Sequence, residues 1–143
     1  MSRFHRVLVA IDFVPVAVRV ADVARELVAA GGALRLLHVV EWVPSVVEGS
    51  LMGYGSPREL RTLHAASERR LEQMARGLAG VSVDTEVVEG QPAGAILDAA
   101  EEWGADLVVL GGRRRARFAG LRIGGVVERV LRSARFPVLV VPV

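Results

Sequence analysis

The chain has 143 residues, of which 52% are apolar, and its 18 basic and 16 acidic side chains leave a formal net charge of +2. This length suits one compact domain, which we expect to span residues 1–143. The absence of cysteine excludes disulfides, thiolate metal ligands and a cysteine nucleophile. The longest apolar stretch, residues 136–143, is far shorter than the roughly 18 residues of a membrane span, and the first apolar run ends at Asp12, unlike a signal peptide. We therefore expect a cytoplasmic protein without a membrane partner.

Apolar periodicity predicts strands and helices that alternate along the whole chain. Runs of β-branched and apolar residues predict five strands, at residues 5–11, 34–40, 81–88, 106–110 and 137–141. Apolar positions three and four residues apart predict four helices, at residues 16–30, 58–78, 92–103 and 124–134. Residues 41–57 contain two prolines and three glycines, and we expect them to form a long loop.

The order of these elements predicts the fold class. Strands that alternate with helices form a parallel sheet with right-handed crossovers and helices on both faces. Residues 7–11 and 107–110 are apolar throughout, as is typical of strands that are buried on both faces. The sequence therefore predicts an α/β protein, a single domain with a doubly wound five-stranded parallel sheet.

The most informative segment follows the fourth predicted strand and reads GGRRRARFAGLRIGG over residues 111–125. In an open α/β sheet a ligand binds beyond the carboxyl ends of the strands. Gly111, directly after the strand, allows a ligand to approach the backbone closely, and Gly124-Gly125 leave free N–H groups at a helix start that can hold a phosphate. Five arginines lie between these glycines, so we predict an anion-binding loop. The alternative is a solvated basic loop whose glycines only cap the strand and the helix.

Several segments together resemble the universal stress protein family. The first strand ends in an Asp-Phe pair, the second reads LLHVV, the fourth reads ADLVVLG, and the chain closes on VVERVLRSARFPVLVVPV. The resemblance covers essentially the whole chain. It implies an adenine nucleotide α-hydrolase-like fold, a homodimer paired through its last strands, and a binding or regulatory role in stress responses rather than an enzymatic one. It also implies a site for ATP or AMP, with Mg²⁺, on a G-x2-G-x9-G-[S/T] loop.

The loop of this chain matches that motif in part. Gly111 and Gly124 match the first and third glycines with the spacing intact, whereas Arg114 replaces the second glycine and Gly125 the final Ser or Thr. An arginine has less access to positive φ than a glycine, and the lost hydroxyl removes a donor to phosphate. Arg114 could instead contact phosphate directly, in bidentate geometry. The other cofactor contacts that the resemblance implies are Asp12 at the ribose, Val39 at the adenine, and Ala10, Leu110 and Val126 nearby.

Other interpretations of these residues stay open. Asp12 could start a turn or cap the first helix, and His38 is more typical of a packed strand residue than of a ligand. The sequence contains neither an HExxH motif nor a Gly-x-Ser-x-Gly elbow, so we expect no catalytic residues and no protein-bound metal. The alternative functions are a dimeric protein-interaction module that has lost nucleotide binding, and a slow ATPase in which Asp12 is the candidate base.

The charge and the last strand bear on the partners. Residues 1–112 hold 10 arginines and 15 acidic residues, a net charge of −5. Residues 113–143 hold 8 arginines and one acidic residue, Glu128, a net charge of +7. A basic segment can indicate nucleic acid, but the aromatic content of 5% and the lack of a recognition-helix motif argue against it. The last strand, PVLVVPV, is apolar and would lie at a sheet edge, so pairing with a second copy is the simplest way to cover it.

Overall fold

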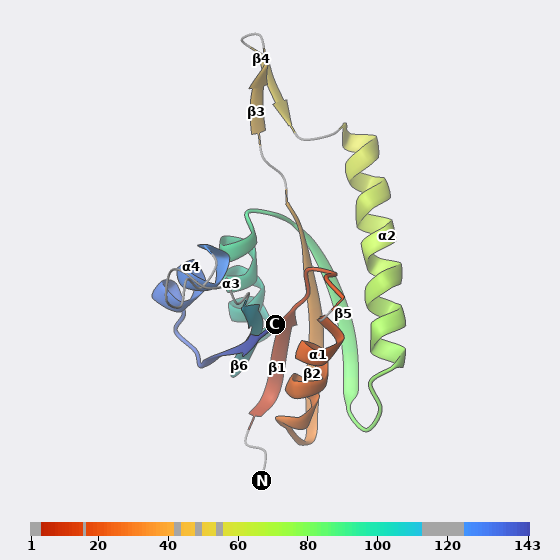
Figure 1. The fold of residues 1–143 in the computed structure, drawn as a ribbon, viewed down its shortest axis with the longest axis vertical. Coiled ribbons are helices and arrows are strands. Elements are labelled where there is room, and N and C mark those ends of the chain that lie inside the picture. The colour runs from red at the N-terminus through yellow and green to blue at the C-terminus, as the bar shows by residue number, and fades with distance from the viewer. Residues whose placement is uncertain (1–3, 16, 42–43, 48–49, 54–55, 113–124) are drawn as a thin grey trace.

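The computed structural model describes residues 4–15, 17–41, 44–47, 50–53, 56–112 and 125–143. Helices and strands alternate along most of this length (Figure 1). Their bounds are β1 (Phe4–Ala10), α1 (Ala17–Glu26), β2 (Val28–Glu41), β3 (Pro44–Val47), β4 (Ser50–Gly53), α2 (Pro57–Arg76), β5 (Ser82–Gly90), α3 (Pro92–Trp103), β6 (Leu107–Gly112), α4 (Gly125–Ser133) and β7 (Val138–Pro142).

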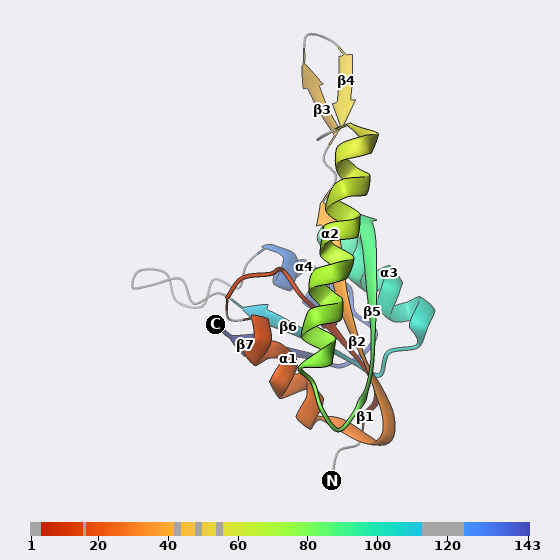
Figure 2. The same cartoon turned by 90° about the vertical axis from the view of Figure 1, so that its right-hand side faces the viewer.

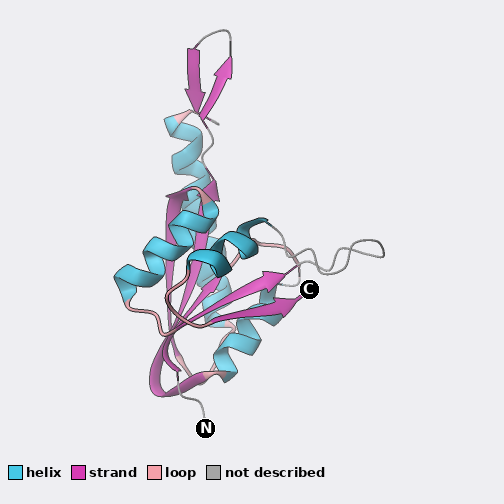
Figure 3. Cartoon of the chain, turned by 90° about the vertical axis from the view of Figure 1, so that its left-hand side faces the viewer, coloured by secondary structure: helices cyan, strands magenta, loops and turns pink. Residues whose placement is uncertain are grey.

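The main sheet has five parallel strands in the order β5-β2-β1-β6-β7. The chain builds outward from β1 through β2 to β5, and then returns to the other side of β1 with β6 and β7. Helices α1 and α2 cover one face (Figure 2), and α3 and α4 cover the other (Figure 3). This arrangement confirms the predicted doubly wound five-stranded α/β fold.

The core consists of two apolar layers, one on each face of the sheet. Val7 and Val9 of β1 pack with α1 and α2, whereas Leu8 between them packs with α3 and α4. All three side chains are fully buried, because alternate residues of a central strand point to opposite covered faces. The continuous apolar run in the sequence therefore has a direct structural cause.

The predicted helix over residues 16–30 is present as α1, but its predicted end, just before Gly31-Gly32, was wrong. Helix α1 ends at Glu26, and β2 begins at Val28 and contains both glycines. The register between β1 and β2 shifts between Phe4 and Arg6, so β2 carries extra residues there. Gly31 has a φ of +80° within this irregularity, and a Cβ on Gly32 would lie 2.8 Å from the His5 carbonyl oxygen. The two glycines thus shape a strand irregularity instead of a helix end.

The prediction that residues 41–57 form a loop was also wrong. Strands β3 and β4 form an antiparallel two-stranded ribbon, in which Ser45 pairs with Met52, and this ribbon projects beyond the carboxyl end of β2 (Figure 1). Strands of four residues are too short for apolar periodicity to reveal.

In the part of the chain that the structure describes, no helix is long and apolar enough to cross a membrane.

Candidate functional site

A cleft of about 540 Å³ opens where β1, β2 and β6 end and α4 begins. Strand β1 lies between β2 and β6, so this is the point at which the strand order reverses, where open α/β sheets bind ligands. The structure brings together at this cleft all seven of the predicted site residues that it describes: Ala10, Asp12, Val39, Leu110, Gly111, Gly125 and Val126. The other two, Arg114 and Gly124, lie outside the described residues.

The cleft combines apolar walls with a polar rim. Ala10, Val39 and Leu110 come from the ends of three neighbouring strands, and Ile96 of α3 joins them. The carboxylates of Asp12 and Glu41 also line the cleft. Gly112 and Gly125 bound the segment 113–124, which carries five arginines in the sequence. The described part of the cleft can therefore hold a flat apolar ring beside hydrogen-bond acceptors.

Asp12 lies in the turn between β1 and α1 and is exposed. Its Oδ1 accepts a hydrogen bond of 3.4 Å from the backbone N–H of Val14, so the carboxylate does start a turn, as one interpretation predicted. No described residue donates to its Oδ2. The turn and a ligand contact are compatible, because the two oxygens of a carboxylate accept hydrogen bonds separately.

His38, near the end of β2, also lines the cleft, although the sequence favoured a packed strand residue over a ligand. Its Nδ1 lies 2.6 Å from the carbonyl oxygen of Ile11. Because a carbonyl oxygen only accepts, Nδ1 carries the proton. Burial lowers the pKa of His38 from its ordinary range, as does the nearby Arg70, whereas the hydrogen bond to Ile11 opposes the shift. The signal for His38 was its position one residue before Val39, at the carboxyl end of a strand.

The two described glycines of the loop motif differ in their surroundings. A Cβ on Gly111 would lie 3.3 Å from a methyl carbon of Val20, so this glycine allows β6 and α1 to approach closely. A Cβ on Gly125 would have no described atom within 4 Å. Gly125 is also the first residue of α4, where backbone N–H groups lack helical partners. Among the described residues, none crowds the amino end of α4 at Gly125, which lines the cleft.

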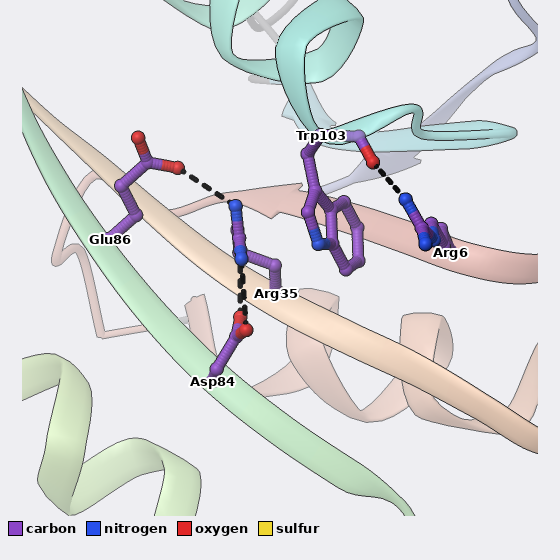
Figure 4. Close-up of polar contacts among 5 residues, drawn as sticks. All are labelled: Arg6, Arg35, Asp84, Glu86 and Trp103. Atoms are coloured by element: carbon purple, nitrogen blue, oxygen red, sulfur yellow. Dashed lines mark hydrogen bonds and ion pairs between the residues drawn. The ribbon is translucent and has the colours of Figure 1, made fainter.

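A second polar cluster, around Arg35, lies away from the cleft and has a structural role (Figure 4). The Arg35 guanidinium donates two hydrogen bonds to Asp84, of 2.8 and 3.0 Å, and lies 4.6 Å from the ring centroid of Trp103. The hydrogen bond to Asp84 raises the pKa of Arg35. Arg6 donates a 2.6 Å hydrogen bond to the Trp103 carbonyl oxygen. These contacts join β1, β2, β5 and the end of α3.

Among the described residues, no group of three or more His, Asp or Glu side chains could hold a metal ion.

The reversed strand order, with a cleft at the point of reversal, defines an open α/β domain whose cleft lies where such sheets bind ligands. Residues 3–142 match the model of the universal stress protein family, and the chain belongs to that family. A universal stress protein encoded in the QAH/OAS sulfhydrylase 3' region of Thermus aquaticus is 36% identical over 140 residues, which are 96% of this chain and 98% of the relative. The predicted family is thereby confirmed.

Two solved structures share the fold over nearly all of their length. A universal stress protein from Burkholderia pseudomallei superposes with a TM-score of 0.73 at 29% identity, covering 97% of this chain and 96% of that one. A universal stress protein solved in complex with cAMP superposes with a TM-score of 0.65 at 24% identity, covering 98% of each chain. At 24% identity, the likeness to the structure with cAMP shows that the two chains share a fold.

Proposed function

We propose that this universal stress protein binds an adenine nucleotide, ATP or AMP, in the cleft between β1, β2, β6 and α4. The observation that carries the proposal is that residues as far apart in the sequence as Ala10 and Val126 line one cleft at the strand reversal. Its volume of about 540 Å³ is in the usual range for small-molecule sites, roughly 300–1,000 Å³. The universal stress protein solved with cAMP supports the proposal to the extent that the same fold can hold an adenine nucleotide.

Each part of the nucleotide has a complementary part of the cleft. Ala10, Val39 and Leu110 would contact the adenine ring, which buries an apolar surface against apolar walls. Asp12 would accept hydrogen bonds from the ribose hydroxyls. The open N–H groups at Gly125 and the arginines of segment 113–124, Arg114 among them, would contact the phosphates. Mg²⁺ would be held chiefly by phosphate oxygens and water.

The proposed role is binding and regulation without turnover. A calorimetric titration of the wild-type chain with ATP, with and without Mg²⁺, tests it directly. Asp12→Asn should weaken binding about tenfold, because it replaces a charged acceptor by a neutral one. Asp98→Asn is the matched control, since Asp98 is exposed on α3, outside the cleft lining, and loses the same charge. Equal ATP affinities of the two variants would mean that Asp12 does not contact the nucleotide.

Arg114→Gly separates the alternative functions. Weaker ATP binding by this variant would mean that Arg114 contacts phosphate. A wild-type chain that gives no heat, together with a binding Arg114→Gly variant, would overturn the proposal in favour of an interaction module that has lost its nucleotide. Phosphate release above background that Asp12→Ala abolishes would instead support the slow ATPase.

The same chain is proposed to act as a cytoplasmic homodimer. Strand β7 is an edge strand, hydrogen-bonded to β6 on one side, and Leu139 and Val140 on it are only half-buried. Pairing with β7 of a second copy would cover this edge, and Pro142 would limit the length of the pairing. Light scattering at high micromolar concentration should give the mass of two chains, and a strict monomer would refute this arrangement.

A further inference from the structure

Phe13, directly after Asp12, has a φ of +60° and is the one described residue other than glycine with a positive φ. A bulky side chain disfavours this conformation, so the surrounding structure must hold Phe13 in place. Strained backbone of this kind concentrates at ligand sites. The contacts of Phe13 therefore indicate what sets the conformation of the Asp12 turn.

His38 holds the residues on both sides of Asp12. Its Nδ1 donates to the carbonyl oxygen of Ile11, before Asp12, at 2.6 Å. Its ring lies 4.3 Å from the ring of Phe13, after Asp12, measured between centroids. Since His38 belongs to β2, in the body of the sheet, these two contacts fix the turn to a rigid element.

Arg70 of α2 makes the third contact. Its guanidinium carbon lies 4.1 Å from the centroid of the Phe13 ring, a cation–π distance. No described carboxylate pairs with Arg70, although other exposed arginines such as Arg132 do have such partners. The turn is therefore connected to β2 through His38 and to α2 through Arg70.

We propose that Phe13, His38 and Arg70 are positioning residues, which hold the strained turn so that Asp12 presents its carboxylate to the ribose of the bound nucleotide. This inference rests on the proposed function. The residues act through Asp12: His38 and Arg70 stabilise a backbone conformation that Phe13 would otherwise leave, and the turn then needs no reordering when the nucleotide binds. Preorganisation of this kind raises affinity by lowering the ordering cost of binding.

The positioning is linked to protonation. The charges of Arg70 on α2 and Asp12 in the turn act on His38, and Glu41 lines the same cleft. Burial and the Arg70 cation lower the pKa of His38 and outweigh the hydrogen bond to Ile11 and the Asp12 carboxylate, so the held turn favours the neutral ring. Acidification charges His38 next to the Arg70 cation and favours the released turn. Nucleotide affinity should therefore fall as the pH decreases below about 6.5.

The first test compares Arg70→Gln with Arg69→Gln. Both arginines are exposed on α2, and each variant loses one positive charge. Calorimetry should give an ATP affinity about two- to fivefold weaker for Arg70→Gln than for Arg69→Gln, which is the effect of one exposed cation–π contact. In the ligand-free chain, hydrogen exchange of the Val14 and Ala17 amides should accelerate in Arg70→Gln and stay at the wild-type rate in Arg69→Gln.

These readouts separate the two proposals. If the wild-type chain binds no ATP, the proposed function is wrong whatever the exchange rates. If it binds ATP and Arg70→Gln behaves as Arg69→Gln in both experiments, the positioning role is wrong and the proposed function stands.

The second test uses His38→Asn, which keeps an N–H donor near the Nδ1 position and loses the ring and its titration. The ratio of wild-type to variant ATP affinity is measured between about pH 5.5 and 7.5, so that titration of the phosphates cancels. We expect the ratio to fall on acidification. A ratio that stays constant with pH would overturn the protonation link.

Discussion

Gly125 stands where the loop motif implied by the resemblance has a serine or threonine, so Gly125→Ser would place a hydroxyl donor at the proposed phosphate position. The substitution has little steric cost, because a Cβ at this position would meet no described atom within 4 Å. One hydrogen bond from a hydroxyl to a charged phosphate contributes about 1.5 kcal/mol at a partly exposed site, which is roughly a tenfold gain in affinity. Serine also has a higher helix propensity than glycine, which favours the start of α4.

Calorimetry with ATP and Mg²⁺ measures this gain, and Gly111→Ser is the matched control. A Cβ on Gly111 would lie 3.3 Å from Val20 and 3.7 Å from Val143, so the same new hydroxyl would crowd α1 and the end of the chain. We expect Gly111→Ser to weaken binding or stability. An unchanged affinity in Gly125→Ser, in a chain that binds ATP, would mean that the phosphates do not lie at the start of α4.

Three further predictions concern stability. Leu71→Ala should lower the free energy of unfolding in urea by about 3 kcal/mol, because Leu71 is fully buried. Leu63→Ala on the same helix should change it by less than about 0.5 kcal/mol, because Leu63 is 53% exposed. Similar losses in the two variants would contradict the packing of α2. Gly112→Ala should cost about 1–3 kcal/mol, since its Cβ would lie 2.6 Å from a methyl of Val140, and Val140→Ala should recover part of that loss; simple additivity in the double-mutant cycle would contradict this contact. Because burial lowers the pKa of His38 from 6.5, the unfolded chain binds this proton more readily, so stability should decrease as the pH falls below about 6.5 toward the folded pKa; an equal decrease in His38→Asn would assign it to other groups.

The sequence located helix α3 more accurately than any other element. Pro92 at its first position and Gly104 after its end are local signals, and the observed bounds are the predicted ones. Gly104 has a φ of +74° and ends the helix in the left-handed conformation. Gly31-Gly32 carry the same local signal but lie inside β2. Pairing with β1 decided their role, and this pairing is not visible in the residues around them.

The residues of the candidate cleft were predictable only where a local pattern marks them. Asp12, Val39 and Gly111 follow or end apolar runs, so their positions at strand ends could be read from the chain. The roles of His38 and Arg70 could not be predicted, because they depend on contacts with Phe13 between elements that are distant in sequence. The positive φ of Phe13 likewise has no signal in an Asp-Phe pair.

The sequence by itself determined the class of fold and the family of this protein. Local periodicity reflects the two faces that each strand and helix presents to the core, and that information is present in every segment. Only the tertiary structure decided the strand order, and with it the meeting of β1, β2 and β6 at one cleft. It also decided that Arg70 of α2 and His38 of β2 contact the residues that flank Asp12, because such contacts arise from packing between elements rather than from the pattern within one.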